Sequence, residues 1–200
     1  MLFGTAGNEA FEGLADRVRM EGDGFRWTLR GFSDVRVDAT QGGVDIATLR
    51  DSAGDDLLVM EPEYSCFQGG NFRNYVTGFD RVDAYASSGD DRVRFYDSVH
   101  DDELAGTPAS ATMKGDSYRN SAAGFDTVAA YARAGGVDTA RLLGSVGNDR
   151  YEGYADQSHL DGSNYRFAIY GFEQVVIDGT QGGQDTARLF DSRGDDTLIM

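Results

Sequence analysis

The sequence predicts an all-β protein, a parallel β-solenoid in which short strands stack coil upon coil. Three observations predict it: the chain repeats itself about every 47 residues, apolar and polar residues alternate over short stretches, and Gly, Asp and Asn gather in turn-like clusters between them. An apolar strand face that one repeat cannot bury alone is buried when successive repeats stack, with strands about 4.8 Å apart.

Two markers define the repeat. Related stretches (LFGTAGNEAFEG, LRDSAGDDLLVM, FYDSVHDDELAG, LLGSVGNDRYEG and LFDSRGDDTLIM) begin at residues 2, 49, 95, 142 and 189, and a Gly-Phe marker begins at 31, 78, 124 and 171. We expect one repeat domain over 1–200, with complete repeats at 2–48, 49–94, 95–141 and 142–188 and a partial repeat at 189–200. Because the last repeat stops partway, we expect the chain to be a segment of a longer one.

Each repeat contains three or four pieces with the pattern of a strand. The first follows the Gly-Phe marker, where Val82 and Ala84 alternate with Arg81 and Asp83. The second follows a Gly-Gly turn, and the third follows the Ser-x-Gly-Asp-Asp turn. The fourth is less regular and runs from Met20, Phe67, Met113 or Leu160 to Phe25, Phe72, Tyr118 or Tyr165. Because no stretch carries a sustained 3.6-residue apolar stripe, we expect almost no helix.

Stacking of equivalent positions predicts apolar columns along the solenoid. The columns comprise Leu2, Leu49, Phe95, Leu142 and Leu189; Phe11, Leu58, Leu104, Tyr151 and Leu198; Phe32, Phe79, Phe125 and Phe172; and Val35, Val82, Val128 and Val175. A repeat forms either one large coil or two coils of roughly 23 residues each, and we favour two. The alternative fold is a β-propeller, because a propeller blade is also a four-stranded unit of this size.

The composition excludes several classes of function. The net charge of −16 argues against binding to nucleic acid or to anionic membranes, which attract basic surfaces. No stretch approaches the roughly 18 apolar residues of a membrane span, so we expect no membrane insertion. The single cysteine, Cys66, excludes an intramolecular disulfide and is interpreted as a small buried apolar residue.

A column of acidic residues, comprising Asp45, Asp91, Asp138 and Asp185, recurs in all four repeats. Stacked carboxylates repel one another unless something neutralises them. A cation would do so. The arginine column Arg26, Arg73, Arg119 and Arg166 would also do so, and we favour this Arg–Asp pairing.

The turn sequence GSVGNDRYEG (144–153) resembles one unit of the hemolysin-type (RTX) calcium-binding repeat, Gly-Gly-x-Gly-x-Asp-x-hydrophobic-x. The resemblance implies calcium ligands at the Asp-Asp or Asn-Asp pairs, namely Asp55, Asp56, Asp101, Asp102, Asn148, Asp149, Asp195 and Asp196. This chain departs from the family because its unit occurs once per repeat rather than in tandem, Glu9 replaces the Asp in the first copy, and His100 replaces a Gly in the third. The alternative is a plain corner, since Gly with positive φ and Asp or Asn capping their own backbone suffice to form such a turn.

The chain as a whole resembles the long degenerate repeats of very large secreted bacterial surface proteins. This resemblance implies an extracellular or cell-surface structural and adhesive module whose partners are neighbouring repeats, calcium and a cell-surface or polysaccharide ligand. Two alternatives remain, a spacer without ligands and a carbohydrate-active β-helix enzyme of the lyase or glycosidase type. The sequence contains no recognisable catalytic motif, and its two histidines, His100 and His159, occupy different positions of different repeats. We therefore expect no enzyme.

Overall fold

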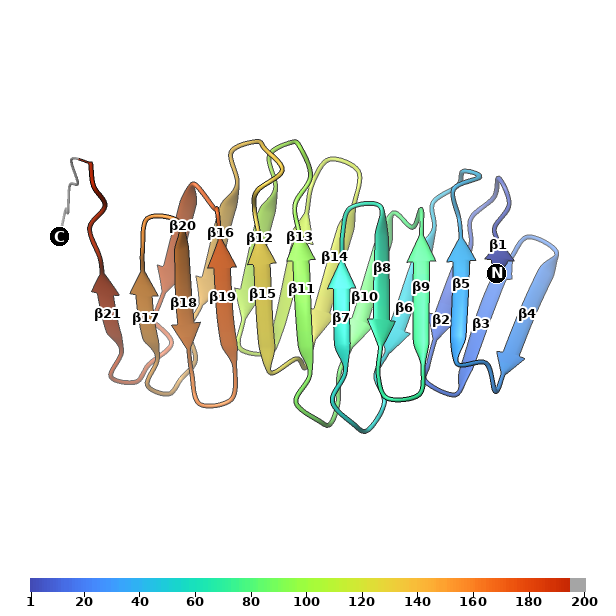
Figure 1. Ribbon diagram of the computed structural model, residues 1–200, viewed down its shortest axis with the longest axis horizontal. Helices are drawn as coiled ribbons and strands as arrows, with labels where there is room; N and C mark the ends of the chain where they lie inside the picture. The colour runs from blue at the N-terminus through green and yellow to red at the C-terminus, as the bar shows by residue number, and fades with distance from the viewer. Residues whose placement is uncertain (195–200) are drawn as a thin grey trace.

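The computed structural model describes residues 1–194. Within these residues the chain forms strands and turns and no helix, which confirms the all-β prediction. The described residues form no helix that is long and apolar enough to cross a membrane. The strands build two long sheets that face each other along a rod, and the N-terminus and residue 194 lie at opposite ends of it (Figure 1). The rod is open rather than a ring of blades, so the solenoid is confirmed and the propeller alternative is wrong.

Twenty-one strands of the described residues divide between the two sheets. In spatial order, sheet A contains β1 (Leu2–Phe3), β5 (Asp34–Asp38), β9 (Arg73–Thr77), β8 (Tyr64–Gln68), β7 (Leu57–Met60), β11 (Arg92–Tyr96), β15 (Thr127–Tyr131), β19 (Arg166–Tyr170), β18 (Gln157–Asp161), β17 (Arg150–Gly153) and β21 (Thr186–Leu189). Sheet B contains β20 (Gln174–Asp178), β16 (Thr139–Leu143), β12 (Glu103–Thr107), β13 (Ser110–Lys114), β14 (Arg119–Ala123), β10 (Arg81–Tyr85), β6 (Ile46–Arg50), β2 (Ala10–Gly13), β3 (Arg17–Gly22) and β4 (Phe25–Arg30).

Within each repeat the chain crosses from one sheet to the other three times. In the second repeat it crosses from β6 in sheet B to the antiparallel meander β7–β8–β9 in sheet A, then to β10 in sheet B, and then to β11 in sheet A, where the third repeat begins. In the third repeat it runs through β11 in sheet A, the meander β12–β13–β14 in sheet B, and β15 in sheet A. A repeat is therefore neither one coil nor two. Because three is odd, successive repeats place the same sequence on opposite sheets.

The fourth strand-like piece of each repeat proves to be two strands. In the second repeat, β8 and β9 are separated by a hairpin that ends at Phe72, and they pair antiparallel, whereas pairs between successive coils are parallel. The sequence pattern missed this division because the aromatic residue at the hairpin continues the apolar run.

The predicted columns of equivalent residues are wrong about which residues touch. Leu49 pairs with Gly13 on one side and Ala84 on the other, and not with Leu2 or Phe95. The alternation itself is correct, since Val82 and Ala84 are buried while Arg81 is exposed. Stacked residues come from different positions of the repeat because each repeat begins on the sheet opposite to that of its predecessor.

The core lies between the two sheets and includes fully buried Leu49, Phe67 and Phe95. The phenylalanines of the second and third Gly-Phe markers pack on the meander of the preceding repeat. The ring centroids of Phe79 and Phe11 lie 6.2 Å apart, and those of Phe125 and Phe67 lie 5.7 Å apart. These rings join consecutive repeats through the core.

Candidate functional site: carboxylate ladders at the corners

The corners of the rod carry rows of stacked acidic residues. The Asp56 N–H donates to Asp91 Oδ1 over 2.9 Å, and the Asp91 N–H donates to Asp126 Oδ2 over 2.9 Å. Asp56 ends the Ser-x-Gly-Asp-Asp turn, Asp91 ends the turn at 87–91 that corresponds to the Gly-Gly turn of the other repeats, and Asp126 ends the Gly-Phe turn. Three turns that are far apart in the sequence therefore form one ladder, with steps of 35 residues.

The same ladder recurs along the described chain. Three further ladders are formed by Glu9, Asp45 and Asp80; by Asp102, Asp138 and Glu173; and by Asp149 and Asp185. In each ladder a carboxylate accepts the backbone N–H of the acidic residue in the preceding coil. Because a buried N–H needs a partner, these carboxylates hold successive coils in register.

The two residues of each predicted ligand pair point to different partners. The second Asp is buried and accepts hydrogen bonds from the serine that begins its turn, as when the Ser52 N–H donates to Asp56 Oδ2 over 2.8 Å. Asp102 and Asp149 are held in the same way by Ser98 and Ser145. These contacts are those of a structural corner.

The first residue of each pair is exposed and reaches forward to the next coil. Asp55 accepts the N–H of Asp90, Asp101 that of Val137, and Asn148 that of Gln184, over 2.8–2.9 Å. The pairs therefore diverge rather than converge on a common point. The last predicted pair, Asp195 and Asp196, lies outside the described residues.

A tyrosine hydroxyl distinguishes the corners of the third and fourth repeats. Tyr118 Oη donates to Asp102 Oδ1 over 2.7 Å, and Tyr165 Oη donates to Asp149 Oδ1 over 2.8 Å. Burial, together with the hydrogen bond to the carboxylate, raises the pKa of Tyr118 above its usual value. Phe72 stands at this position in the second repeat, so Asp56 lacks this donor.

The second repeat also gathers three carboxylates at its corner. One oxygen each of Asp51, Asp56 and Asp91 lies within 4.8 Å of the other two. Asp51 Oδ2 accepts from Ser87, and Asp91 Oδ1 accepts from the N–H of Asp56. Among the described interactions, the second oxygen of Asp51 and that of Asp91 accept no hydrogen bond. The corner thus offers carboxylate oxygens without a donor from the chain.

Among the ion pairs of residues 1–194, none joins an arginine to a carboxylate of the buried ladders. Arg26 pairs with Glu21, Arg73 with Asp34 and Arg166 with Asp161, all on the outer faces of the sheets. The predicted pairing of the arginine column with Asp45, Asp91, Asp138 and Asp185 is therefore wrong for the ion pairs of the described residues. Arginines stand on outward-facing positions of the strands, whereas these aspartates lie inside the corners.

Unneutralised burial alters the acidity of the ladder. Burial raises the pKa of Asp91 to about 6, and the neighbouring carboxylates of Asp51, Asp56 and Asp126 add to the rise. Burial likewise raises the pKa of Asp138 to about 6, with contributions from the carboxylates around it. The middle rung of a ladder is thus poised to hold a proton or a cation.

We predict that the protein is more stable at pH 5 than at pH 7.5 in the presence of a chelator. A carboxyl group whose pKa rises from 3.8 to about 6 on folding stabilises the folded state below the lower value, and this contribution is lost as the pH rises through about 6. The midpoint of thermal unfolding, followed by circular dichroism, should be at least about 3 °C higher at pH 5 than at pH 7.5. Asp91→Asn should shrink the rise, and a midpoint that is higher at pH 7.5 would contradict the prediction.

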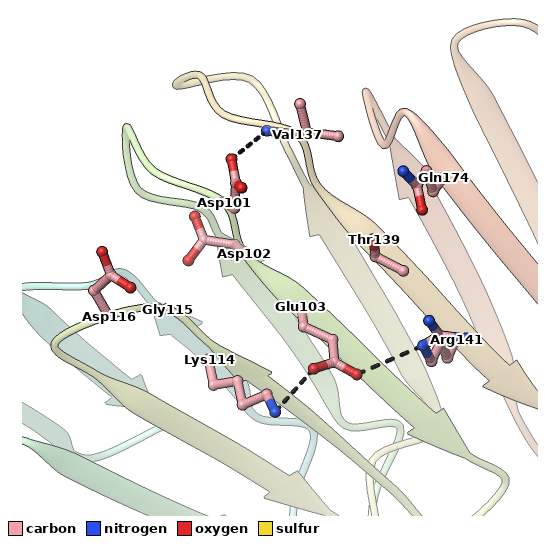
Figure 2. Close-up of a pocket in the computed structure, with 10 residues that line it drawn as sticks. All are labelled: Asp101, Asp102, Glu103, Lys114, Gly115, Asp116, Val137, Thr139, Arg141 and Gln174. Carbon is pink, nitrogen blue, oxygen red and sulfur yellow. Dashed lines mark hydrogen bonds and ion pairs between the residues drawn. The ribbon is translucent and has the colours of Figure 1, made fainter.

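The outer faces carry one open groove beside these corners in the second repeat and another in the third. In the third repeat a groove of about 610 Å³ on sheet B is lined by the turns at 101–102 and 115–116 (Figure 2). On its floor Glu103 accepts from Lys114 over 2.8 Å and lies 3.7 Å from Arg141 (Figure 2). The counterpart in the second repeat, of about 450 Å³, lies on sheet A and includes Asp55, Arg92 and Arg94. The floors of both grooves combine charges of both signs.

Reasoning from the sequence missed the contributions of Asp51, Ser52, Asp126 and Tyr118. A 35-residue offset between acidic residues would have revealed Asp126, but the 47-residue repeat conceals it. The geometry is that of an interlocked acidic scaffold in which Asp51, Asp56 and Asp91 converge at the corner of the second repeat. No family model, no curated protein and no solved structure matches the chain.

Proposed function

We propose that the chain is a structural and adhesive repeat module of an extracellular or cell-surface protein, and that calcium binds at the corner of its second repeat. The observation that carries the proposal is the convergence of Asp51, Asp56 and Asp91 at one corner. Among the described residues, no arginine or lysine forms an ion pair with these three carboxylates, and the one ion pair of the neighbouring Arg92 is with Asp90. The three carboxylates come from two successive coils, so an ion held between them ties these coils together.

The regularity of the rod favours a structural role. Every described corner of the Ser-x-Gly-Asp-Asp type bonds to the next coil through the same backbone-to-carboxylate contact. The grooves beside the corners are open, and two of their basic residues pair with acidic neighbours, Arg92 with Asp90 and Lys114 with Glu103. A repeated scaffold of this kind extends a protein and presents an acidic surface.

Calcium suits the open corner better than other ions. It takes six to eight oxygen ligands from carboxylates, carbonyls and water, and it tolerates irregular geometry. Magnesium demands a tighter octahedron and gives up water reluctantly. Extracellular modules bind calcium with dissociation constants of roughly 0.1–1 mM, which suffices at extracellular concentrations.

We predict that calcium raises the thermal midpoint of the chain. An ion that binds only the folded state stabilises it by mass action, so about 5 mM calcium and a dissociation constant of about 0.1 mM give roughly 2 kcal/mol. The midpoint should rise by about 4–8 °C relative to chelator, while equal magnesium should have little effect. If the chain is already folded as β-structure in chelator and calcium causes no shift of the midpoint, calcium binding is overturned. The hypothesis of a spacer without ligands would then remain.

Two variants locate the effect. Phe72→Tyr places a hydroxyl beside Asp56, as Tyr118 does beside Asp102, and should abolish the calcium response while preserving or increasing stability in chelator. Asp51→Asn keeps an acceptor for Ser87 but removes a charge, and should weaken the response. Asp101→Asn is the matched control, because this exposed residue lies at the corner of the third repeat, and its response should equal that of the wild type.

The adhesive part of the proposal concerns a polysaccharide. With a net charge of −16 the chain repels an anionic polysaccharide unless a shared cation bridges the two sets of carboxylates. Polygalacturonate should therefore retain the chain in calcium and release it in chelator. Retention in chelator, or none in calcium, would argue against this partner.

A further inference from the structure

We propose that a carboxylated polysaccharide binds on the outer face of β11, β15 and β19, next to the corner of Asp51, Asp56 and Asp91, here the calcium corner. This inference deepens the proposed function and rests on it, because it gives the polysaccharide a place beside the ion. The three strands lie side by side in sheet A (Figure 1). Their outward-facing side chains, together with Arg133, are here the arginine–tyrosine face.

The arginine–tyrosine face carries no carboxylate, although the chain has a net charge of −16. The outward-facing positions of its three strands hold only arginine, tyrosine, threonine and alanine. Acidic residues surround it: Asp55 and Asp90 stand beside the calcium corner, and Asp161 and Glu152 face outward from β18 and β17. The face is therefore a basic and aromatic island on an acidic rod, and its charge complements an anionic ligand.

Two guanidinium groups of this face are without a carboxylate partner among the described residues. Arg94 is exposed and lies on β11 between apolar residues of β7 and β15. Arg133 lies over the rings of Tyr131 and Tyr170, 5.4 and 5.6 Å from their centroids. Because guanidinium offers a planar fork of donors that matches a carboxylate, both groups can bind carboxylates of a ligand.

The tyrosines form a stacked row along one side of the face. The ring centroids of Tyr96 and Tyr131 lie 5.0 Å apart, and those of Tyr131 and Tyr170 lie 4.9 Å apart, with nearly parallel planes. Stacked rings cover one another's faces and leave exposed their edges, which are the positive part of the ring quadrupole. The hydroxyls of these tyrosines make no hydrogen bond among the described interactions. The row thus offers positive edges and hydroxyl groups to an anionic, hydroxyl-rich polymer.

A groove joins the arginine–tyrosine face to the calcium corner. This groove, of about 450 Å³, is lined by Arg92 and Arg94 of the face and by Asp56 of the corner. Gly69 also lines it, and a Cβ atom there would lie 1.7 Å from Asp56 Oδ1, so only glycine leaves room for this carboxylate. One ligand in the groove can therefore meet both the ion at the corner and the guanidinium of Arg94.

The acidic surroundings give the ion its importance. A polyanion that approaches the groove meets the carboxylates of Asp55 and Asp90, which repel it. Calcium at the corner reverses the local charge and removes this barrier. The arginines then add affinity that they do not provide in chelator, when the ligand faces the whole negative charge of the chain.

The retention of the chain on immobilised polygalacturonate, in about 5 mM calcium, tests the proposal. Arg94→Gln should lower the association constant at least about threefold, because it removes the charge and the fork of donors. Arg94→Gln combined with Arg133→Gln should lower it at least about tenfold, because contacts along one polymer reinforce each other. Dextran, an uncharged polysaccharide, should not retain the chain.

Arg50→Gln combined with Arg119→Gln is the matched control. Both residues are exposed on sheet B, and Arg50 lies 4.9 Å from the ring centroid of Tyr85, much as Arg133 lies over its tyrosines. This control has the same net charge as the test variant, so general attraction affects both equally. The polymer should retain it as it does the wild type. Circular dichroism establishes that each variant is folded.

The outcomes separate this inference from the proposed function. Equal retention of the wild type and the Arg94→Gln/Arg133→Gln variant would overturn the inference alone, as would equal losses in the test and control variants. The thermal midpoint of each protein, with and without calcium, reports on the ion site. A midpoint that calcium does not raise would overturn the ion site on which both proposals rest. A wild type that calcium stabilises but polygalacturonate does not retain would overturn the polysaccharide partner and this inference with it.

Discussion

The Asp102→Ala variant is expected to lose about 3–5 kcal/mol of unfolding free energy, because it leaves several buried donors without an acceptor. Asp102 accepts hydrogen bonds from the N–H and hydroxyl of Ser98 and from the hydroxyl of Tyr118, over 2.7–2.8 Å. Asp102 as a whole is 3% exposed, so water cannot replace the carboxylate without opening the corner. Urea unfolding, followed by circular dichroism, measures the loss.

Asp101→Ala is the control for this experiment. Asp101 precedes Asp102 in the same turn, but it is exposed and accepts one backbone N–H, that of Val137. Its loss should amount to about 1 kcal/mol or less. Equal effects of the two substitutions would mean that the buried ladder does not hold the corner together.

The Gly136→Ala variant is expected to be destabilised by about 2–4 kcal/mol, because it combines backbone strain with a collision. Gly136 has a φ of 91°, and a Cβ atom there would lie 2.4 Å from the carbonyl oxygen of His100 in the neighbouring corner. The obstacle is backbone, so it cannot rotate away. Gly43, Gly89 and Gly183 meet the preceding corner in the same way.

Gly54→Ala provides the comparison. Gly54 lies in a Ser-x-Gly-Asp-Asp turn without a positive φ, and a Cβ atom there would meet only Ser52 Oγ at 3.9 Å. His100 occupies the equivalent position in the third repeat, which shows that a side chain fits. Gly54→Ala should shift the urea midpoint little, and a large shift would argue against close corner packing as the reason for the Gly-Gly turn.

Much of the fold could be predicted from the sequence, because apolar and polar residues alternate with a period of two along a strand that has one buried face. The alternation around Val82 and Ala84 and the glycine-rich corners predicted an all-β solenoid. The stacking partners were not accessible. Leu49 stacks on Gly13 and Ala84 because the chain crosses between sheets an odd number of times per repeat, and no local pattern records that number.

The site was accessible only in part. The resemblance drew attention to Asp55 and Asp56, of which only Asp56 belongs to the open corner. Asp91 was visible as a member of another acidic column, but its meeting with Asp56 depends on the 35-residue step between coils. The difference between Phe72 and Tyr118 changes one atom of the side chain, and its meaning emerges only when the carboxylate beside it is known.

Because the number of crossings per repeat is odd, the meanders of successive repeats alternate between the two sides of the rod. Deleting or duplicating one repeat of about 47 residues would transfer every later meander, with its groove and acidic corner, to the opposite side of the rod. A gain or loss of two repeats would leave later features facing as before and would change only their distance. Changes in the number of repeats would therefore keep each groove and acidic corner on the same side of the rod only when repeats are gained or lost in pairs.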